Sequence, residues 1–391
     1  MSVLIELGDT RGAPPDDEHR PPAGPSPRWR VALLLAMCAL LGGAAAPARL
    51  SAQVGPALPS RAILLSAGPL LLVVDPGADP PTLSAYDTAA SYRTPRWRVG
   101  MSPATGWSAE IAGDLLLITE RDQLRRASAT TARSVRTGLP LWRRPERVYA
   151  VGDTAVAVSE VRSASEPGRR VEGVVHGVDA GTGATRWSVP VPSTAVLEVL
   201  PDPPARVLLV QDDGLARLLD ARDGRVRGQG SLPPADYGPD NPQAVGGHLV
   251  LRHPSGAGVT LTGYDLPGLV PRWRMPVEAG DLTLRACQGL LCAQDRGGRW
   301  AFDPGSGTRA WTWPAGQRWR TVAGARGATD TLVLFGTAAD GRRTLVATVG
   351  RDGPRVRGVL PAGITDCRRA GARLVCRESA ARVSVWPLDV R

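Results

Sequence analysis

A pattern of ten residues recurs along the chain at a spacing of about 43 residues, and it limits the possible folds more than any other feature of the sequence. The clearest copies are VDAGTGATRW from Val178, YDLPGLVPRW from Tyr264 and FDPGSGTRAW from Phe302. In each copy, an aspartate precedes a tryptophan by eight residues. A unit of this length is too long for a repeat with one strand, and it suits four short antiparallel strands.

The chain carries eight such units. Their first positions, aspartate in six of the eight, are Asp87, Ser134, Asp179, Asp220, Asp265, Asp303, Val349 and Asp389. The tryptophans in phase with them are Trp97, Trp142, Trp187, Trp273 and Trp311. Short runs rich in Val, Leu and Trp lie between turn residues, as strands do. We therefore expect an all-β, eight-bladed propeller with four-stranded antiparallel blades; a seven-bladed ring with a loose C-terminal unit is the alternative.

Each repeated residue type has a structural role in this interpretation. The aspartate ends the third strand of its unit, where its carboxylate accepts N–H groups of the turn about two residues on. A glycine four residues after the aspartate takes the positive φ of a tight turn. The tryptophan lies on the fourth strand, where its flat ring covers the joint between neighbouring sheets. The repeated residues are therefore expected to be structural rather than catalytic.

This run of repeats resembles the pyrroloquinoline-quinone-like β-propeller repeat family over roughly residues 50–391. The resemblance implies the propeller fold. Quinone-dependent dehydrogenases of this superfamily carry adjacent cysteines, a calcium site and a catalytic carboxylate. The present sequence has no adjacent cysteine pair and no position to which those residues carry over. The resemblance therefore implies the repeat without the quinone or the metal, and no cofactor is expected.

The last unit has only three strands before Arg391. Folded rings avoid an open strand edge, so a fourth strand is expected from elsewhere in the chain. The segment QVGPALP ends in Leu58-Pro59, as the fourth strands of two other units end in Leu-Pro. We expect residues 52–58 to pair beside residues 382–387 and to complete the eighth blade.

The N-terminal part does not follow the repeat. Residues 1–28 are rich in proline and charge and predict a disordered cytoplasmic tail, in which Ser2–Gly8 is a candidate docking strand. Residues 31–46 carry no charge, and residues 29–48 predict a transmembrane signal anchor with the N-terminus inside. The alternative is a signal peptide cleaved at Ala46-Pro47-Ala48, which gives a secreted protein. Both place the propeller, residues 49–391, outside the cytoplasm.

Four of the five cysteines predict two disulfides. Cys287 with Cys292, and Cys367 with Cys376, fall on the first two strands of their units, whereas Cys38 lies in the apolar segment. Two-residue loops at Gly289-Leu290 and at Gly371-Ala372 would set each pair directly opposite across a hairpin. A zinc site of four thiolates is the alternative, but the spacings fit it poorly. An extracytoplasmic compartment favours disulfides.

Charge and motif content argue against several functions. The net charge is +10, and all 47 basic residues are arginine, which indicates a high-GC, actinobacterial type of coding sequence. No arginine run with interleaved aromatics appears, so no nucleic acid is expected as partner. The four histidines are scattered, and the loop with Asp236, Asp240 and Asn241 lacks the ligand spacing of a calcium site. No catalytic motif is present, and an enzyme is not expected.

The functional expectation is a non-catalytic, membrane-anchored extracytoplasmic propeller. It would act as a scaffold or recognition module for a protein or a cell-envelope partner, which the sequence does not name. Two alternatives remain at this point: a quinone-dependent oxidoreductase, and an assembly factor for envelope proteins, because an outer-membrane assembly lipoprotein with the same repeat type is also an eight-bladed propeller.

Overall fold

The structure is a computed structural model. It describes residues 50, 52–59, 61–89, 92–122, 127–161, 170–200, 204–211, 213–232, 240–255, 258–277, 282–295, 298–314, 319–322, 332–337 and 343–388. All of these lie in one compact unit, Pro47–Arg391. The expected tail (1–28), the anchor (29–48) and Asp389 lie outside the described residues. Within the described ranges, no helix has the length and apolar character needed to cross a membrane.

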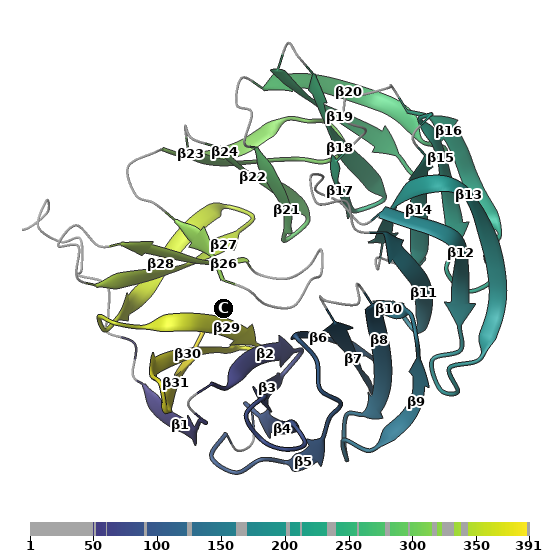
Figure 1. Ribbon diagram of the computed structural model, residues 1–391. Helices are drawn as coiled ribbons and strands as arrows, with labels where there is room; N and C mark the ends of the chain where they lie inside the picture. The colour runs from purple at the N-terminus through teal and green to yellow at the C-terminus, as the bar shows by residue number, and fades with distance from the viewer. Residues whose placement is uncertain are drawn as a thin grey trace, which may run out of the picture. The chain divides into compact units, whose positions relative to one another are not determined.

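Eight four-stranded antiparallel blades form a closed ring (Figure 1). The described residues contain 31 strands, one of which serves two blades. The innermost strands lie around the centre of the ring, and several neighbouring ones contact each other, such as β2 with β6, β2 with β29, and β17 with β21. The predicted all-β, eight-bladed propeller is therefore confirmed, and the seven-bladed alternative is wrong.

The first four blades follow the chain from inside to outside. Blade 1 consists of β2 (Ile63–Ala67), β3 (Leu70–Asp75), β4 (Thr82–Asp87) and β5 (Trp97–Gly100). Blade 2 consists of β6 (Gly106–Ala112), β7 (Leu115–Asp122), β8 (Ala127–Ser134) and β9 (Pro140–Arg144). Blade 3 consists of β10 (Arg147–Val151), β11 (Thr154–Val161), β12 (Arg170–Val178) and β13 (Thr185–Leu200). Blade 4 consists of the end of β13, β14 (Arg206–Gln211), β15 (Leu215–Asp220) and β16 (Val226–Ser231).

The other four blades repeat the arrangement. Blade 5 consists of β17 (Asp240–Val245), β18 (His248–Ser255), β19 (Gly258–Asp265) and β20 (Val270–Val277). Blade 6 consists of β21 (Thr283–Cys287), β22 (Leu290–Asp295), β23 (Gly298–Phe302) and β24 (Arg309–Pro314). Blade 7 consists of β25 (Arg320–Thr321), β26 (Leu332–Thr337), β27 (Thr344–Gly350) and β28 (Gly353–Leu360). Blade 8 consists of β29 (Thr365–Ala370), β30 (Arg373–Ser379), β31 (Arg382–Pro387) and β1 (Gln53–Ala57).

The ring closes as the sequence predicts. Strand β1 pairs antiparallel with β31, with Gln53 opposite Val385 and Ala57 opposite Arg382. The backbone N–H of Leu58 donates to the carbonyl of Ala381 at 2.9 Å. The first strand of the propeller is thus the outermost strand of its last blade, so one blade holds both ends of the ring (Figure 1).

Blades 3 and 4 are connected by a continuous strand and not by a loop. Strand β13 runs through 16 residues, and its first part is the outer strand of blade 3. Its last six residues, Ala195–Leu200, pair with β14 as the inner strand of blade 4. Blades 3 and 4 therefore form one continuous seven-stranded sheet.

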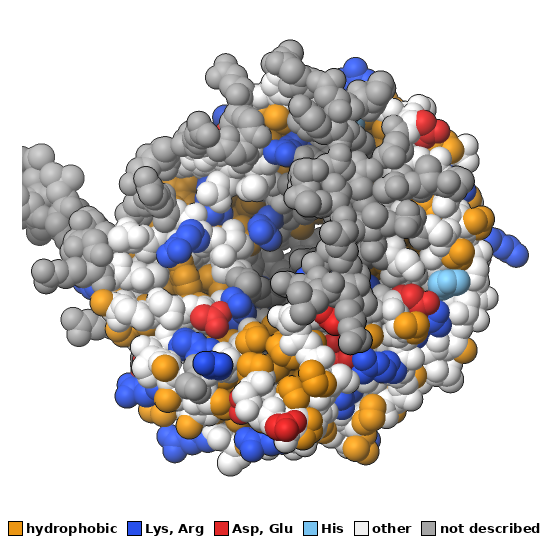
Figure 2. All heavy atoms as spheres, in the orientation of Figure 1, with side chains coloured by type: hydrophobic (Ala, Val, Ile, Leu, Met, Phe, Trp, Pro, Cys, Tyr) orange, Lys and Arg blue, Asp and Glu red, His pale blue; other side chains and the backbone are white. Residues whose placement is uncertain are grey.

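The core lies between the blades. A cluster of buried apolar side chains fills each of the eight joints between neighbouring sheets of the described ring. A sheet buried on both faces needs a neighbour on each side, which explains why such units stack radially and close. On the face drawn in Figure 2, the basic side chains that are described lie over several blades and not in a single patch.

Candidate functional site

The turns that follow the repeated aspartates lie on one face of the ring. In a blade of four antiparallel strands, the turn between strands one and two and the turn between strands three and four lie at the same end. We call this end of the ring the turn face. Asp220 accepts the N–H of Arg222 at 2.9 Å, and Asp303 accepts that of Gly305 at 3.0 Å. The carboxylate therefore holds the backbone of its own turn in both blades.

Asp179 shows the fullest set of these contacts. Its Oδ1 accepts the N–H of Thr182 at 2.8 Å and the hydroxyl of the same residue at 2.9 Å. Its Oδ2 accepts from the guanidinium of Arg186. The bond from Arg186, followed by those from Thr182, lowers the pKa of the Asp179 carboxyl to about 2. The carboxylate is thus charged at neutral pH and fixed between a turn and a strand.

At four joints, a tryptophan of one blade donates a hydrogen bond to the turn of the next blade. The indole Nε1 donates to the carbonyl of the residue that follows the repeated position, at distances of 2.8 to 3.1 Å. The pairs are Trp97 with Val135, Trp142 with Ala180, Trp187 with Ala221, and Trp273 with Pro304. Each ring also lies against the turn glycine of the next blade, whose φ is between 70° and 73°, so that a Cβ there would strike the ring.

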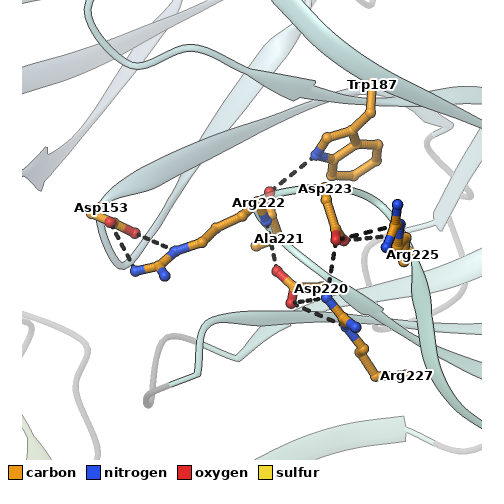
Figure 3. Close-up of polar contacts among 8 residues, drawn as sticks. All are labelled: Asp153, Trp187, Asp220, Ala221, Arg222, Asp223, Arg225 and Arg227. Carbon is orange, nitrogen blue, oxygen red and sulfur yellow. Dashed lines mark hydrogen bonds and ion pairs between the residues drawn. The ribbon is translucent and has the colours of Figure 1, made fainter.

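The joint between blades 3 and 4 shows the arrangement in detail (Figure 3). Below the Trp187–Ala221 bond, Asp220 pairs with Arg227 at 3.0 Å, and Arg227 also reaches Asp223 at 2.9 Å. Arg222 crosses to Asp153 of blade 3 at 3.0 Å. This part of the turn face therefore carries a dense group of charges, each with a partner.

The ion pair between the repeated aspartate and an arginine was not predicted, although the sequence holds a signal for it. The arginine directly precedes the tryptophan position, in Arg96, Arg186, Arg227 and Arg272. Unit two has Ser134 in place of the aspartate, and it also has Leu141 in place of the arginine. Unit six keeps Asp303 but has Ala310 at the arginine position, so the aspartate also occurs without this ion pair.

Blade 5 departs from the expected turn. The N–H two residues after Asp265 would belong to Pro267, which has none. Asp265 instead accepts from Arg272 and pairs with Nδ1 of His248 at 3.1 Å. The expectation that every repeated aspartate caps its own turn is therefore wrong here. Arg272 is the main cause of the lowered pKa of Asp265.

The joint between blades 4 and 5 has no tryptophan. Gly228 occupies that position, and a Cβ on Gly228 would overlap the carbonyl oxygen of Pro267 in the next blade. The backbones of the two blades thus approach each other directly where a ring lies between them elsewhere. Only glycine permits this approach.

Blade 7 lacks the tryptophan bond on both sides. The ring of Trp311 lies beside Gly353 of blade 7, but its Nε1 has no acceptor among the described residues. Arg357 stands at the tryptophan position of blade 7 and donates to Thr348 of its own blade at 2.7 Å. The degenerate unit at Val349 therefore marks two joints at which the described residues show no tryptophan bond.

Both expected disulfides are present, and both line those joints. Cys287–Cys292 belongs to the cluster between blades 6 and 7, and Cys367–Cys376 belongs to the cluster between blades 7 and 8. Each bond links the two inner strands of one blade and does not cross the joint. Blade 7 is therefore packed between two cross-linked hairpins.

The register of the first hairpin corrects our expectation. Cys287 lies opposite Leu290, and the loop is Gln288–Gly289, both with positive φ. The two cysteines are therefore diagonal neighbours with their Cα atoms 5.9 Å apart. A loop at Gly289–Leu290 would have exposed Leu290, which the observed turn buries. In the second hairpin, the predicted loop Gly371–Ala372 is confirmed, and the Cα atoms of Cys367 and Cys376 are 4.0 Å apart.

Exposed aliphatic side chains lie next to the turn face. Leu139 and Leu141 of blade 2 are 60% and 51% exposed, and Val226 of blade 4 and Val270 of blade 5 are 50% and 53% exposed. All four lie in or directly before an outermost strand, within seven residues of the repeated position. In ring order, the two leucines come before the joint between blades 3 and 4, which carries the charged group, and the two valines come after it. We call these four residues and the charged group the rim stripe.

Among the described residues, no group of three or more His, Cys, Asp and Glu side chains is arranged to hold a metal ion. His248 is engaged with Asp265, and His176 lies 2.9 Å from the hydroxyl of Ser188. Asp236 lies outside the described residues, and nothing is concluded about the loop that contains it.

The fold defines the protein as an eight-bladed β-propeller. No protein-family model matches the sequence, and no curated protein matches it. Similar solved structures include BamB from Moraxella catarrhalis, with 16% identity over 87% of this chain and 99% of that chain and a TM-score of 0.53. The computationally designed protein Ika8 has 11% identity over 88% and 98%, with a TM-score of 0.53. The Dos1 propeller has 11% identity over 88% and 95%, with a TM-score of 0.52. At these identities, the likeness concerns the fold alone.

Proposed function

We propose that this protein is a non-catalytic recognition or scaffold module that binds a protein partner through the rim stripe. The proposal includes attachment to a membrane through residues 29–48, with the propeller on the extracytoplasmic side. It also includes the assignment of the repeat to the pyrroloquinoline-quinone-like type, without the quinone.

The observation that carries the proposal is the composition of the rim stripe. In ring order, exposed aliphatic residues come on both sides of a group of ion pairs, Leu139 and Leu141 before it and Val226 and Val270 after it. Apolar side chains grouped at a surface and bordered by polar ones are typical of protein interfaces. The stripe is also rigid, because Trp142, Trp187 and the turn aspartates fix its backbone. A rigid surface loses little conformational entropy on binding.

Site-specific cross-linking tests this proposal. A photo-reactive residue at Leu141 is compared in membranes with the same residue at Ala310, which is exposed at the equivalent position of blade 6. We expect a defined adduct from position 141 and none from position 310. With the purified partner, Leu141→Asp should weaken binding at least about tenfold, because a charge replaces an apolar contact, while Ala310→Asp has little effect. Equal adducts from both positions would contradict the rim stripe as the binding surface.

Membrane attachment needs its own measurement. Fractionation of cells that express the full chain should place it in the membrane pellet, resistant to carbonate extraction. The attachment would be refuted if the mature chain in the medium begins after Ala46, since that result identifies a cleaved signal peptide.

A further inference from the structure

Arg299 of blade 6 is a buried cation with no carboxylate partner among the residues that the structure describes. The residue is only 8% exposed, and its Nη2 donates to the carbonyl of Trp319 at 2.7 Å. Among the described residues, no carboxylate forms an ion pair with it, and the same holds for Arg285 nearby. Burial, with a smaller effect from Arg285, lowers the pKa of Arg299 to about 10. A buried charge without a partner is costly, so a stable fold normally supplies one.

A second buried arginine has the nearby carboxylate that the described residues do not provide for Arg299. Arg133 of blade 2 is 7% exposed, and burial also lowers its pKa. However, the nearby Glu120 raises the pKa of Arg133 again, and both Gly138 and Gly100 accept hydrogen bonds from its guanidinium. The ring can therefore compensate a buried arginine with its own residues, and the described part of the chain shows no such carboxylate for Arg299.

The strand register places further hydrogen-bond donors on the same face of blade 6 as Arg299. Arg285 lies opposite Cys292, and Gln294 lies opposite both Thr283 and Arg299, so these side chains lie on one face of blade 6. The two arginine strands are separated by one strand, or roughly 10 Å, a distance that two long side chains can bridge.

A pocket of about 300 Å³, partly open to solvent, lies where these groups meet blade 7. Arg285, Arg299, Thr283 and Thr321 line it, together with Trp311, whose Nε1 has no acceptor among the described residues. Its apolar wall is formed by residues that include Leu332 and Val349. The site thus combines two cations, an indole N–H and two hydroxyls, and none of its described lining residues is a carboxylate.

We propose that this pocket between blades 6 and 7 binds a phosphate group, either free or as a phosphate monoester. Two guanidinium groups balance the two charges of the ligand. Arginine, indole and hydroxyl donors approach from different directions, as the oxygens of a tetrahedral oxyanion require. An attached group would extend through the side of the pocket that is open to solvent.

Calorimetric titration of the purified full chain with inorganic phosphate, at constant ionic strength, tests the proposal. We expect saturable binding with one site. Arg285→Gln, at an exposed residue, should weaken the affinity by about tenfold or more, because a charge-assisted bond is lost. Trp311→Phe keeps the ring and removes only the N–H, and it should weaken binding by about three- to tenfold. Arg355→Gln is the matched control, since it removes an exposed arginine of blade 7 that pairs with Asp352, and it should change the affinity less than about twofold.

Arg299→Gln should abolish binding, and circular dichroism checks that this variant is folded; the two other variants test the site if it is not. Glycerol phosphate in place of phosphate distinguishes the sources: tighter binding identifies a monoester, and weaker binding identifies the free ion. The proposal is overturned if phosphate does not bind at millimolar concentration, if acetate binds equally well, or if Arg285→Gln and Trp311→Phe bind as the wild type does.

Discussion

Two parts of the ring join their blades differently. The outer strands of blades 1, 2 and 3 each supply a tryptophan whose N–H bonds the turn of the next blade. Around blade 7, no such bond exists among the described residues, and the two flanking blades carry the disulfides. The first device links two blades directly, whereas the second stiffens one blade so that its face keeps its shape.

The difference follows from the position of blade 7. Its inner strand, β25, has only two residues, and its repeat has Val349 and Arg357 where most other units have aspartate and tryptophan. Its own elements thus provide few fixed contacts to a neighbour. Cross-linked hairpins on both sides offer it preformed surfaces. The comparison indicates that a degenerate repeat can be retained when the adjacent repeats are reinforced.

The closing strand should have the largest effect on both parts of the ring. Deletion of residues 49–59 removes β1 and the buried Leu58, and it opens blade 8. We expect the free energy of unfolding to fall by more than about 4 kcal/mol, from lost burial and lost ladder bonds. Urea denaturation of the deleted and full chains measures it. Unchanged stability would mean that the ring does not depend on its closure.

Gly228→Ala should have the next largest effect. The new methyl group overlaps the carbonyl of Pro267, so blades 4 and 5 must separate. We expect a loss of about 3 kcal/mol, in the range of severe overpacking. Gly106→Ala is the control, because no atom lies within 4 Å of its added Cβ. The direct backbone contact is refuted if both variants unfold at the same urea concentration.

Removal of the disulfides should affect the arc around blade 7 and leave the tryptophan-linked arc intact. Serine at Cys287 and Cys292, or at Cys367 and Cys376, should cost about 2–3 kcal/mol in each case, by the chain-entropy relation for short loops. Hydrogen exchange should show faster exchange in β25–β28 than in β6–β12 of the same variant. A uniform increase around the ring would contradict a local role.

Phenylalanine at two tryptophan positions isolates the N–H bond. Trp142→Phe loses the bond to Ala180, whereas Trp311→Phe loses an N–H that has no acceptor in the described structure. The lost ring area is the same in both. We therefore expect Trp142→Phe to be less stable than Trp311→Phe by about 1 kcal/mol in phosphate-free buffer. Equal losses would show that the rings act by packing alone.

Asp179 should give the smallest effect, and it depends on pH. Its folded pKa, about 2, lies below the usual value, so its contribution to stability is fully present above about pH 4 and is lost as the pH falls towards 2. Asp179→Asn should therefore flatten the stability profile between about pH 4 and pH 2. NMR titration of the carboxyl resonance measures the pKa itself, and a value near 4 would remove the basis for this expectation.

Local rules explain what the sequence could predict. The turn at Asp220, the positive φ of Gly224 and the place of Trp187 each depend on neighbouring residues in the chain. The repeat then extends these features to the other blades. The closing strand could also be inferred, because the last unit is one strand short.

What the sequence could not predict depends on contacts between distant strands. Pro190 within WSVPVPS suggests a break, yet β13 continues, because Pro190 pairs with Val174 on one side of an outer strand. Arg285 and Arg299 are separated by a whole strand in the sequence, and only the sheet register brings them together. The hairpin loop likewise lies at Gln288–Gly289 and not at the predicted Gly289–Leu290, because the observed position buries Leu290.

The continuity of β13 has a consequence for how this chain can change. Elsewhere, a loop between blades offers a place where residues can be inserted without moving either sheet. Between blades 3 and 4 there is no connecting loop: Thr185–Leu200 pairs with β12, with a register shift between Val171 and Gly173, and its last six residues pair with β14 in regular register. An added residue would shift the register and turn buried side chains outward. This pair of blades is thus expected to be inherited as a single block, of constant length, while the other connections vary among relatives.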